Sequence, residues 1–129
     1  MREILFRAKR VDNGEWVEGD FVSNKYILQG YRVERGFVVP YNTFEVIPET
    51  VGQYTGLTDK NGKKIFEGDI VRWTTSTYYP IVIVEFFDGA FVIKNRGNHI
   101  KAPLYHYCRL VEVIGNIHDN PELLEVNND

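Results

Sequence analysis

The chain has 129 residues, of which 43% are hydrophobic and 14% aromatic, and this composition excludes an intrinsically disordered protein. The length suits one compact domain, or one domain with a small appended lobe. A formal net charge of −3 and a pI of about 5.6 argue against a nucleic-acid-binding protein, in which a basic balance or a basic stripe is usual.

The cellular compartment is indicated by cysteine usage and hydropathy. The single cysteine, Cys108, excludes an intramolecular disulfide and fits a reducing cytoplasm. Residues 1–10 have no long apolar run after their charges, so they do not resemble a signal peptide. The most apolar stretch, residues 78–84, is too short to cross a bilayer. We therefore expect a cytoplasmic protein without a membrane segment.

Short apolar runs, rich in Val, Ile, Phe and Tyr, alternate along the chain with Gly, Asn, Asp and Pro. This pattern is typical of an all-β protein, and no long segment shows helical periodicity. Strands are expected at residues 26–28, 37–39, 70–73 and 109–113, in addition to three hairpins. Near the end, Asn120 followed by Pro121 and Glu122 is typical of a helix start, and one short helix is expected there.

The first hairpin is centred on Asn13-Gly14, a pair that readily adopts the two-residue type I′ turn. The predicted register places Phe6 opposite Phe21, Arg7 opposite Asp20, Lys9 opposite Glu18 and Asp12 opposite Glu15. One face then carries the apolar residues Ile4, Phe6, Ala8, Val17 and Phe21. The other face carries two cross-strand pairs of opposite charge, so the apolar and ionic patterns agree on one register.

Two further turns are predicted, at Asp88-Gly89 and at Asn61-Gly62. The first places Val84 opposite Ile93 and Phe86 opposite Phe91, and the second places Leu57 opposite Phe66 and Asp59 opposite Lys64. The second face of the Asp88-Gly89 hairpin is apolar as well, at Ile81, Ile83, Phe87 and Val92. A sheet with one solvent-exposed face alternates more cleanly, so either the N-terminal hairpin or another subunit is expected to cover this face.

The residues that could carry catalysis or bind a metal do not form a recognised pattern. His106 and Cys108 would share a strand face, and His118 could approach them, but zinc sites usually pair their ligands at short spacing. The sequence has no phosphate-binding glycine loop and no nucleophile elbow. A cysteine beside aromatic residues is more often a small buried hydrophobe than a nucleophile. We therefore predict no catalytic residue, no metal site and no cofactor.

Two basic segments keep nucleic-acid binding open as an alternative. Arg7 and Lys9 lie on the N-terminal strand, but the predicted register sets each of them against an acid. The second segment has Lys94, Arg96 and Lys101 around a Gly-Asn turn that could touch phosphates. The many aromatic residues could also stack on bases. Because few basic residues are left free, we expect only weak binding at physiological salt.

Three stretches of the chain carry specific motifs. They are residues 52–71, residues 4–9 with Trp16-Val17, and residues 114–117 with residues 119–124. Their motif residues include Tyr54, Thr55, Gly56, Leu57, Asp59, Gly62, Ile65, Glu67, Gly68, Asp69, Val71, Gly115, Asn116, Asn120 and Pro121. Together these motifs resemble the YopX family of phage and prophage proteins, over nearly the whole chain except residues 22–43.

The resemblance implies a β-rich fold, a phage or prophage origin and residence in a bacterial cytoplasm. It implies no activity, because the family is one of unknown function, and it brings no catalytic residues to this chain. The motif residues have a structural explanation instead. Gly56, Gly62 and Gly68 suit turns or bulges, and Asn120-Pro121 suits the start of a helix.

The fold we predict is mainly antiparallel β, with an N-terminal β-hairpin region over residues 1–48. A small, partly open, SH3-like barrel with a short terminal helix follows over residues 49–129, and the two parts could pack as one unit. The leading function is a non-catalytic binding module that self-associates and contacts a phage or host protein. The alternative is an accessory nucleic-acid-binding protein of phage replication or regulation. The residues expected at an interface are Trp16, Ile83, Phe87 and Val92.

Overall fold

The computed structural model describes residues 3–126 and confirms the predicted fold class. The chain is mostly β-strand, in antiparallel sheets, and forms a partly open β fold with short helical segments. It divides into two compact units between Tyr54 and Thr55. Each unit has its own cluster of buried side chains, so the two are described separately below.

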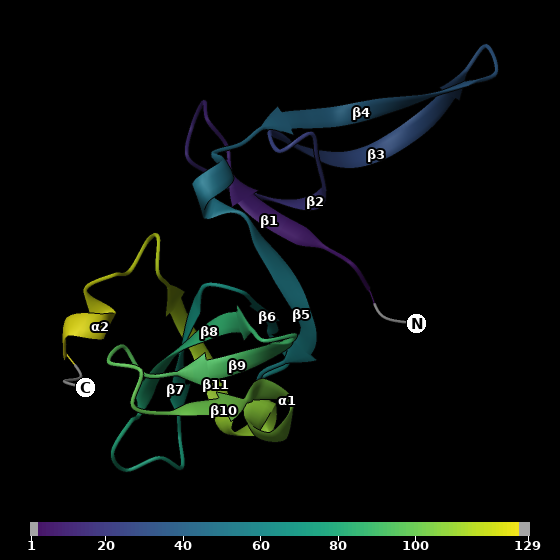
Figure 1. Ribbon diagram of the computed structural model, residues 1–129. Helices are drawn as coiled ribbons and strands as arrows, with labels where there is room; N and C mark the ends of the chain where they lie inside the picture. The colour runs from purple at the N-terminus through teal and green to yellow at the C-terminus, as the bar shows by residue number, and fades with distance from the viewer. Residues whose placement is uncertain (1–2, 127–129) are drawn as a thin grey trace. The chain divides into compact units, whose positions relative to one another are not determined.

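Unit 1 is built from four antiparallel strands (Figure 1). They are β1 (Phe6–Lys9), β2 (Trp16–Val22), β3 (Tyr26–Glu34) and β4 (Phe37–Glu45), and a 3₁₀ turn, η1 (Pro48–Thr50), precedes β5 (Gly52–Thr58). The strands lie in the order β4-β3-β2-β1-β5. Ala8 on β1, Ile27 on β3 and Val46, which forms an isolated bridge with Arg10 just after β4, make up a small buried core. The half-buried residues around it are Phe6, Val17, Phe21, Phe44 and Val51.

The first hairpin forms where it was predicted, but its register is wrong by two residues. Phe6 lies opposite Gly19, and the pairs that follow are Arg7 with Glu18, Ala8 with Val17 and Lys9 with Trp16. The loop has four residues because the Asn13 side chain accepts a hydrogen bond from the Glu15 N–H at 2.9 Å, and only Gly14 takes a positive φ. A shift of two residues preserves the faces, so Phe6, Ala8, Val17 and Phe21 pack on one apolar face as predicted, with the Phe6 and Phe21 rings 6.1 Å apart. The prediction was wrong for Ile4, which is 60% exposed.

Unit 2 continues from β5 through β6 (Lys64–Phe66) into a five-stranded sheet in the order β10-β9-β8-β7-β11. The strands of this sheet are β7 (Asp69–Trp73), β8 (Ile81–Phe87), β9 (Ala90–Lys94), β10 (Lys101–Pro103) and β11 (Val111–Asn116). The helical segments are α1 (Leu104–Tyr107), η2 (Cys108–Leu110) and α2 (Leu123–Val126). The last strand, β11, returns to pair with β7, so that β10 and β11 form the two edges of this sheet.

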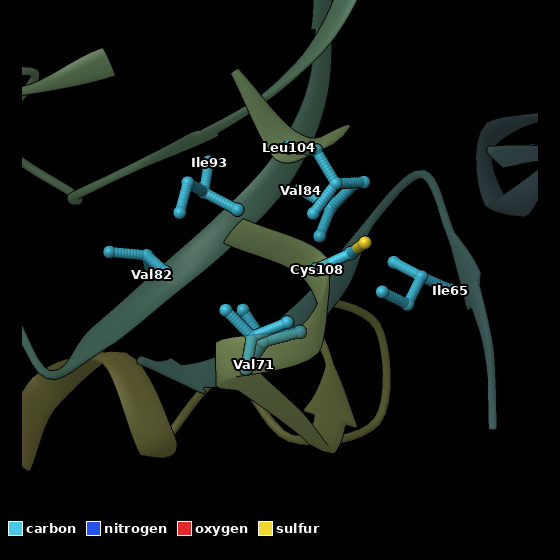
Figure 2. Packing of buried hydrophobic residues seen from close by; sticks show 8 residues of the cluster. Ile65, Val71, Val82, Val84, Ile93, Leu104 and Cys108 are labelled. Atoms are coloured by element: carbon cyan, nitrogen blue, oxygen red, sulfur yellow. The ribbon is translucent and has the colours of Figure 1, made fainter. Parts of the chain in front are cut away.

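The core of unit 2 is larger and aliphatic (Figure 2). Its buried members are Ile65, Val71, Val82, Val84, Ile93, Leu104, Cys108 and Val111. Figure 2 shows Cys108 among these side chains, and its thiol lies 3.8 Å from the Tyr105 carbonyl oxygen. The prediction that Cys108 is a buried hydrophobe is therefore confirmed, although the residue lies in η2 and not on a strand.

The register predicted for the Asp88-Gly89 turn is confirmed, and the register predicted for the Asn61-Gly62 turn is wrong. Asp88 and Gly89 both have positive φ, and the predicted pairs Val84–Ile93 and Phe86–Phe91 are confirmed. At Asn61-Gly62 the predicted pairing of Asp59 with Lys64 is wrong, because the Asp59 N–H donates to the Lys63 carbonyl at 2.8 Å. A three-residue loop forms there, with Gly62 as its left-handed residue.

Two local predictions near the C-terminus are corrected by side-chain contacts. Arg109 and Leu110 lie in η2, so the last strand begins at Val111 and not at Arg109. A short helix forms, but it begins at Leu123, and the Asn120 side chain does not cap it. Instead, Asn120 Oδ1 accepts a hydrogen bond from the Asn116 N–H at 3.2 Å, on the side that faces β11.

Candidate interaction surface

The outer half of the β3–β4 hairpin leaves the sheet. Pairing between β2 and β3 ends at Asp20 and Leu28, whereas β3 and β4 stay paired as far as Glu34 and Phe37. Residues 29–40 therefore form a two-stranded ribbon, which we call the arm, and Figure 1 shows it running on beyond β1 and β2. Because a two-stranded ribbon has no second layer, its side chains have little to pack against.

One face of the arm is apolar and exposed. Tyr31 pairs with Pro40 and Val33 pairs with Val38, so the four side chains share a face. The exposed fraction is 49% for Tyr31, 72% for Val33 and 69% for Val38. We call these four residues the apolar arm face. Large apolar side chains exposed side by side usually mark an interaction site.

The opposite face and the tip of the arm carry its charges. Arg32 and Glu34 form an ion pair at 3.0 Å, and Phe37 beside them is 73% exposed. The tip is a tight turn in which Arg35 and Gly36 both have positive φ, at 50° and 84°. These angles are those of a type I′ turn, which continues the twist of the two strands.

A hollow of about 520 Å³, which we call the notch, lies where β3 diverges from β2. It is lined by Leu5, Glu18, Gly19, Asp20, Leu28, Gln29, Gly30 and Tyr31. Beside the notch, β3 approaches Gly19 closely, because a Cβ at this position would lie 2.3 Å from the Leu28 carbonyl oxygen. The Gln29 amide donates to the Glu18 carbonyl at 3.0 Å, and the Tyr31 hydroxyl donates to Asp20 at 3.4 Å.

The structure places the four predicted interface residues in different environments. Phe87 is exposed, and the Lys101 ammonium lies 3.4 Å from the centre of its ring. Val92 is buried, with 8% of its surface exposed, and Ile83 is half-buried on β8, near which α2 packs. Trp16 is half-buried in unit 1, with the Arg7 guanidinium 4.9 Å from its ring. The four residues do not form one continuous exposed surface in either unit.

The motif residue Asp59 is a buried structural anchor. One carboxylate oxygen accepts the N–H groups of Asn61 and Lys63, and the other accepts the N–H of Val113, all within 2.9 Å. Burial acts to raise the pKa of Asp59, but these hydrogen bonds and the nearby Lys63 charge outweigh it, so the pKa lies below its ordinary value. Asp59 therefore fastens the 59–63 turn to β11.

A second set of motif residues positions the chain end against β11. Gly115 follows a bulge in the pairing of β11 with β7. A Cβ on Gly115 would lie 2.6 Å from Asn120 Oδ1, so glycine is needed for the Asn120 side chain to reach the backbone of Asn116. Asn116 in turn accepts the N–H groups of His118 and Asp119 at 3.0 Å.

The remaining motif residues also have structural positions. Tyr54, Thr55, Ile65, Asp69 and Val71 are buried, Leu57 and Glu67 are half-buried, Gly56, Gly62 and Gly68 have positive φ, and Pro121 is exposed. Thr55 donates its hydroxyl to the Ile65 carbonyl at 2.8 Å, and Asp69 accepts the Phe66 N–H at 2.8 Å. The motifs therefore define turns and buried polar contacts within unit 2, together with the end of β5 that enters it.

The possible metal ligands lie apart in the described part of the chain. His106 is exposed on α1 and Cys108 is buried in η2, and the imidazole of His99 lies 3.2 Å from the Asn95 amide. Among residues 3–126 no group of three or more His, Cys, Asp and Glu side chains is placed to hold a metal ion. Within the same residues, no helix is long and apolar enough to cross a membrane.

Sequence reasoning missed the arm. It predicted short strands at residues 26–28 and 37–39, whereas the strands have nine residues each. The pair Arg35-Gly36 between two β-rich runs was the available turn signal. Apolar residues such as Val33 and Val38 would still have been assigned to the core, because periodicity predicts which residues share a face and not whether another layer covers it.

Comparisons with known proteins agree with this organisation. The family model described as YopX protein matches residues 5–125. The crystal structure of protein EF1440 from Enterococcus faecalis is similar, with 27% sequence identity, a TM-score of 0.62, and coverage of 96% of this chain and 99% of that chain. No curated protein matches the chain. Since the family model covers nearly its whole length, the chain belongs to the YopX family.

Proposed function

We propose that this protein is a non-catalytic binding module of phage or prophage origin, which self-associates and contacts a phage or host protein in the bacterial cytoplasm. The observation that carries the proposal is the apolar arm face, formed by Tyr31, Val33, Val38 and Pro40 on a ribbon with no second layer. Exposing such residues is unfavourable in water, and covering them on binding gives back roughly 25 cal/mol per Å² of apolar surface.

The polar residues of the motifs support a non-catalytic role. Asp59 and Asp69 are the carboxylates that burial could have tuned for acid–base chemistry, but both accept hydrogen bonds from the backbone. The pKa of Asp59 lies below its ordinary value, so this carboxylate stays charged near neutral pH and is a poor proton carrier. Asp59 and Asp69 therefore help to hold the backbone conformation of unit 2 through these hydrogen bonds.

The strand order of unit 2 supports a comparison with SH3-like barrels. Strands β7 to β10 form a meander, a short helical segment follows, and β11 returns beside β7. Small barrels of this kind serve many unrelated functions, so the comparison favours a binding module without naming its partner.

The arm can be tested by affinity capture with the full-length protein. Wild type, the double variant Val33→Ser/Val38→Ser and the control variant Tyr78→Ser would each be tagged and used to capture proteins from induced host cells. Tyr78 is 83% exposed and belongs to unit 2, so its variant removes an exposed apolar side chain that is not part of the arm. We expect a partner captured by wild type and by the control to be lost with the arm variant. Equal capture by all three would contradict a role for the arm.

A second candidate function, nucleic-acid binding, is favoured by one feature of unit 1. The Trp16 ring has the Arg7 guanidinium at 4.9 Å and the Lys9 ammonium at 5.6 Å from its centre. An aromatic ring with cations close to it can stack on a base while the cations contact phosphates. The other basic segment is engaged, since Lys94 pairs with Glu85 at 3.1 Å and Lys101 covers Phe87.

Fluorescence anisotropy with a labelled single strand distinguishes the two candidates. Near physiological salt, about 150 mM, we expect binding weaker than micromolar, because few cations are available to release counterions. Sub-micromolar binding that is lost in Trp16→Ala would make nucleic acid the leading candidate.

A further inference from the structure

We propose that the occupant of the arm is a second copy of this chain, and that the Arg35 tip of each copy enters the notch of the other. This inference rests on the proposed function, since it names the partner of the same arm. Three features support it, namely the free edge of β3, the complementary charges of tip and notch, and the symmetry of the resulting contact.

The edge of β3 is available for pairing beyond the notch. Within the described residues, β3 pairs with β2 only as far as Leu28, and from Gln29 to Glu34 it pairs with β4 alone. The backbone N–H and C=O groups on its other side can therefore accept an added strand. The notch lies at the start of this free edge, because Gln29, Gly30 and Tyr31 line it.

The notch is acidic and the tip is basic. The charged residues of the notch are Glu18 and Asp20, and in the described chain neither has an ion-pair partner within 4 Å. At the tip, Arg32 is neutralised by Glu34, which leaves Arg35 as the charge of the turn. Complementary charge of this kind steers association and fixes the register of a contact.

The residue type at the tip is not explained by the turn. Arg35 has a φ of 50°, a left-handed conformation that Asn, Asp and Gly adopt far more readily than arginine does. At the equivalent position of the β8–β9 turn the chain has Asp88, with a φ of 51°. An arginine at the tip therefore suits a contact outside the turn, and the notch of a second copy supplies one.

A dimer with twofold symmetry forms both contacts between the Arg35 tip of one copy and the notch of the other. If two β3 edges pair antiparallel about Val33, Arg35 of one copy lies opposite Tyr31 of the other, whose hydroxyl donates to Asp20 in the notch. The separation from Tyr31 to Arg35 is about 13 Å at about 3.3 Å per residue, and it is the same in both copies, so the second contact closes with the first. The apolar arm face has no charge, so the symmetric contact brings no like charges together there.

The inference can be tested by charge exchange in the full-length protein, with mass measured by sedimentation velocity across a dilution series. The variants are Arg35→Glu, Asp20→Lys and their combination, and the matched controls are Lys60→Glu and Glu49→Lys, which change exposed charges outside the arm and the notch. We expect wild type and controls to form a dimer. Each single arm variant should weaken association at least about tenfold, because two equivalent contacts are lost in each dimer, and the combination should restore it.

Two outcomes would overturn the inference. One is a dimer that is unaffected by Arg35→Glu and by Asp20→Lys, and the other is a wild-type chain that stays at its monomer mass of 15.0 kDa throughout. Neither outcome decides the role of the arm with another protein, because the capture experiment with Val33→Ser/Val38→Ser measures that role separately. If the Val33→Ser/Val38→Ser variant captures the same proteins as wild type, but the charge-exchange variants change the dimer as expected, the arm acts only in self-association.

Discussion

At the scale of single residues, Asp59 shows how one buried carboxylate can hold two segments that are far apart in the sequence. Asp59→Asn keeps the size of the side chain but replaces one acceptor oxygen with an NH₂ group that faces a backbone N–H. We expect a loss of about 1–3 kcal/mol in the free energy of unfolding near neutral pH. Urea denaturation of the two proteins measures it.

Wild type and Asp59→Asn should also differ in how the free energy of unfolding depends on pH. The pKa of Asp59 is lower in the folded chain than its ordinary value of 3.8, so its stabilising contribution is complete above that value. It is lost as the pH falls through the lower folded pKa. The difference in unfolding free energy between wild type and Asp59→Asn should therefore narrow below about pH 3.8. A difference that stays constant into strong acid would show that the carboxylate charge is not involved.

Gly115 gives a second prediction at the residue scale. Gly115→Ala places a methyl group 2.6 Å from Asn120 Oδ1, so the Asn120 side chain must leave the Asn116 N–H. We expect a destabilisation of about 1–3 kcal/mol, measured by thermal or urea unfolding. In an Asn120→Ala background the obstructing atoms are largely absent, and the added cost of Gly115→Ala should be small. Equal costs in both backgrounds would mean that the close approach is unimportant.

At the scale of elements, two turns of the same type differ in what they support. Gly36 and Gly89 both have positive φ, and an added Cβ would meet nothing within 4 Å at either position. An alanine at either position therefore destabilises its turn only through the unfavourable left-handed backbone conformation, by about 1–2 kcal/mol. For Gly89→Ala we expect the free energy of global unfolding to fall by this amount, because β8 and β9 carry the core residues Val84 and Ile93. For Gly36→Ala global stability should change little, since the arm can open without exposing the core of unit 1.

At the scale of the whole molecule, the two units have cores of different size. The core cluster of unit 2 has eight buried residues and that of unit 1 has three. Because stability is not uniform across a chain, units with fewer buried contacts open at lower free energy. We expect the amides of β7 and β8 to exchange with deuterium more slowly than those of β1 and β2. Equal protection in both units would mean that they open together as one cooperative structure.

The sequence by itself determined the features that depend on local chemistry. The alternation of apolar residues predicted an antiparallel β fold, and Asp88-Gly89 predicted a correct register, because both residues adopt the left-handed angles that a two-residue turn requires. The faces of the first hairpin were also predictable. A register error of two residues leaves them unchanged, so even the wrong pairing of Phe6 with Phe21 assigned both to the apolar face.

Only the tertiary structure decided the features that depend on distant neighbours. Asn120 reads locally as a helix cap, but its side chain bonds to Asn116 because Gly115 leaves room for it. Nothing in the sequence shows that Val33 and Val38 are exposed; they are so because β2 ends its pairing at Asp20 and no second layer covers the ribbon beyond. The physical reason is the same for both. A residue's own turn and face are set by its nearest neighbours, whereas its burial and hydrogen-bond partner are set by whichever part of the chain packs against it.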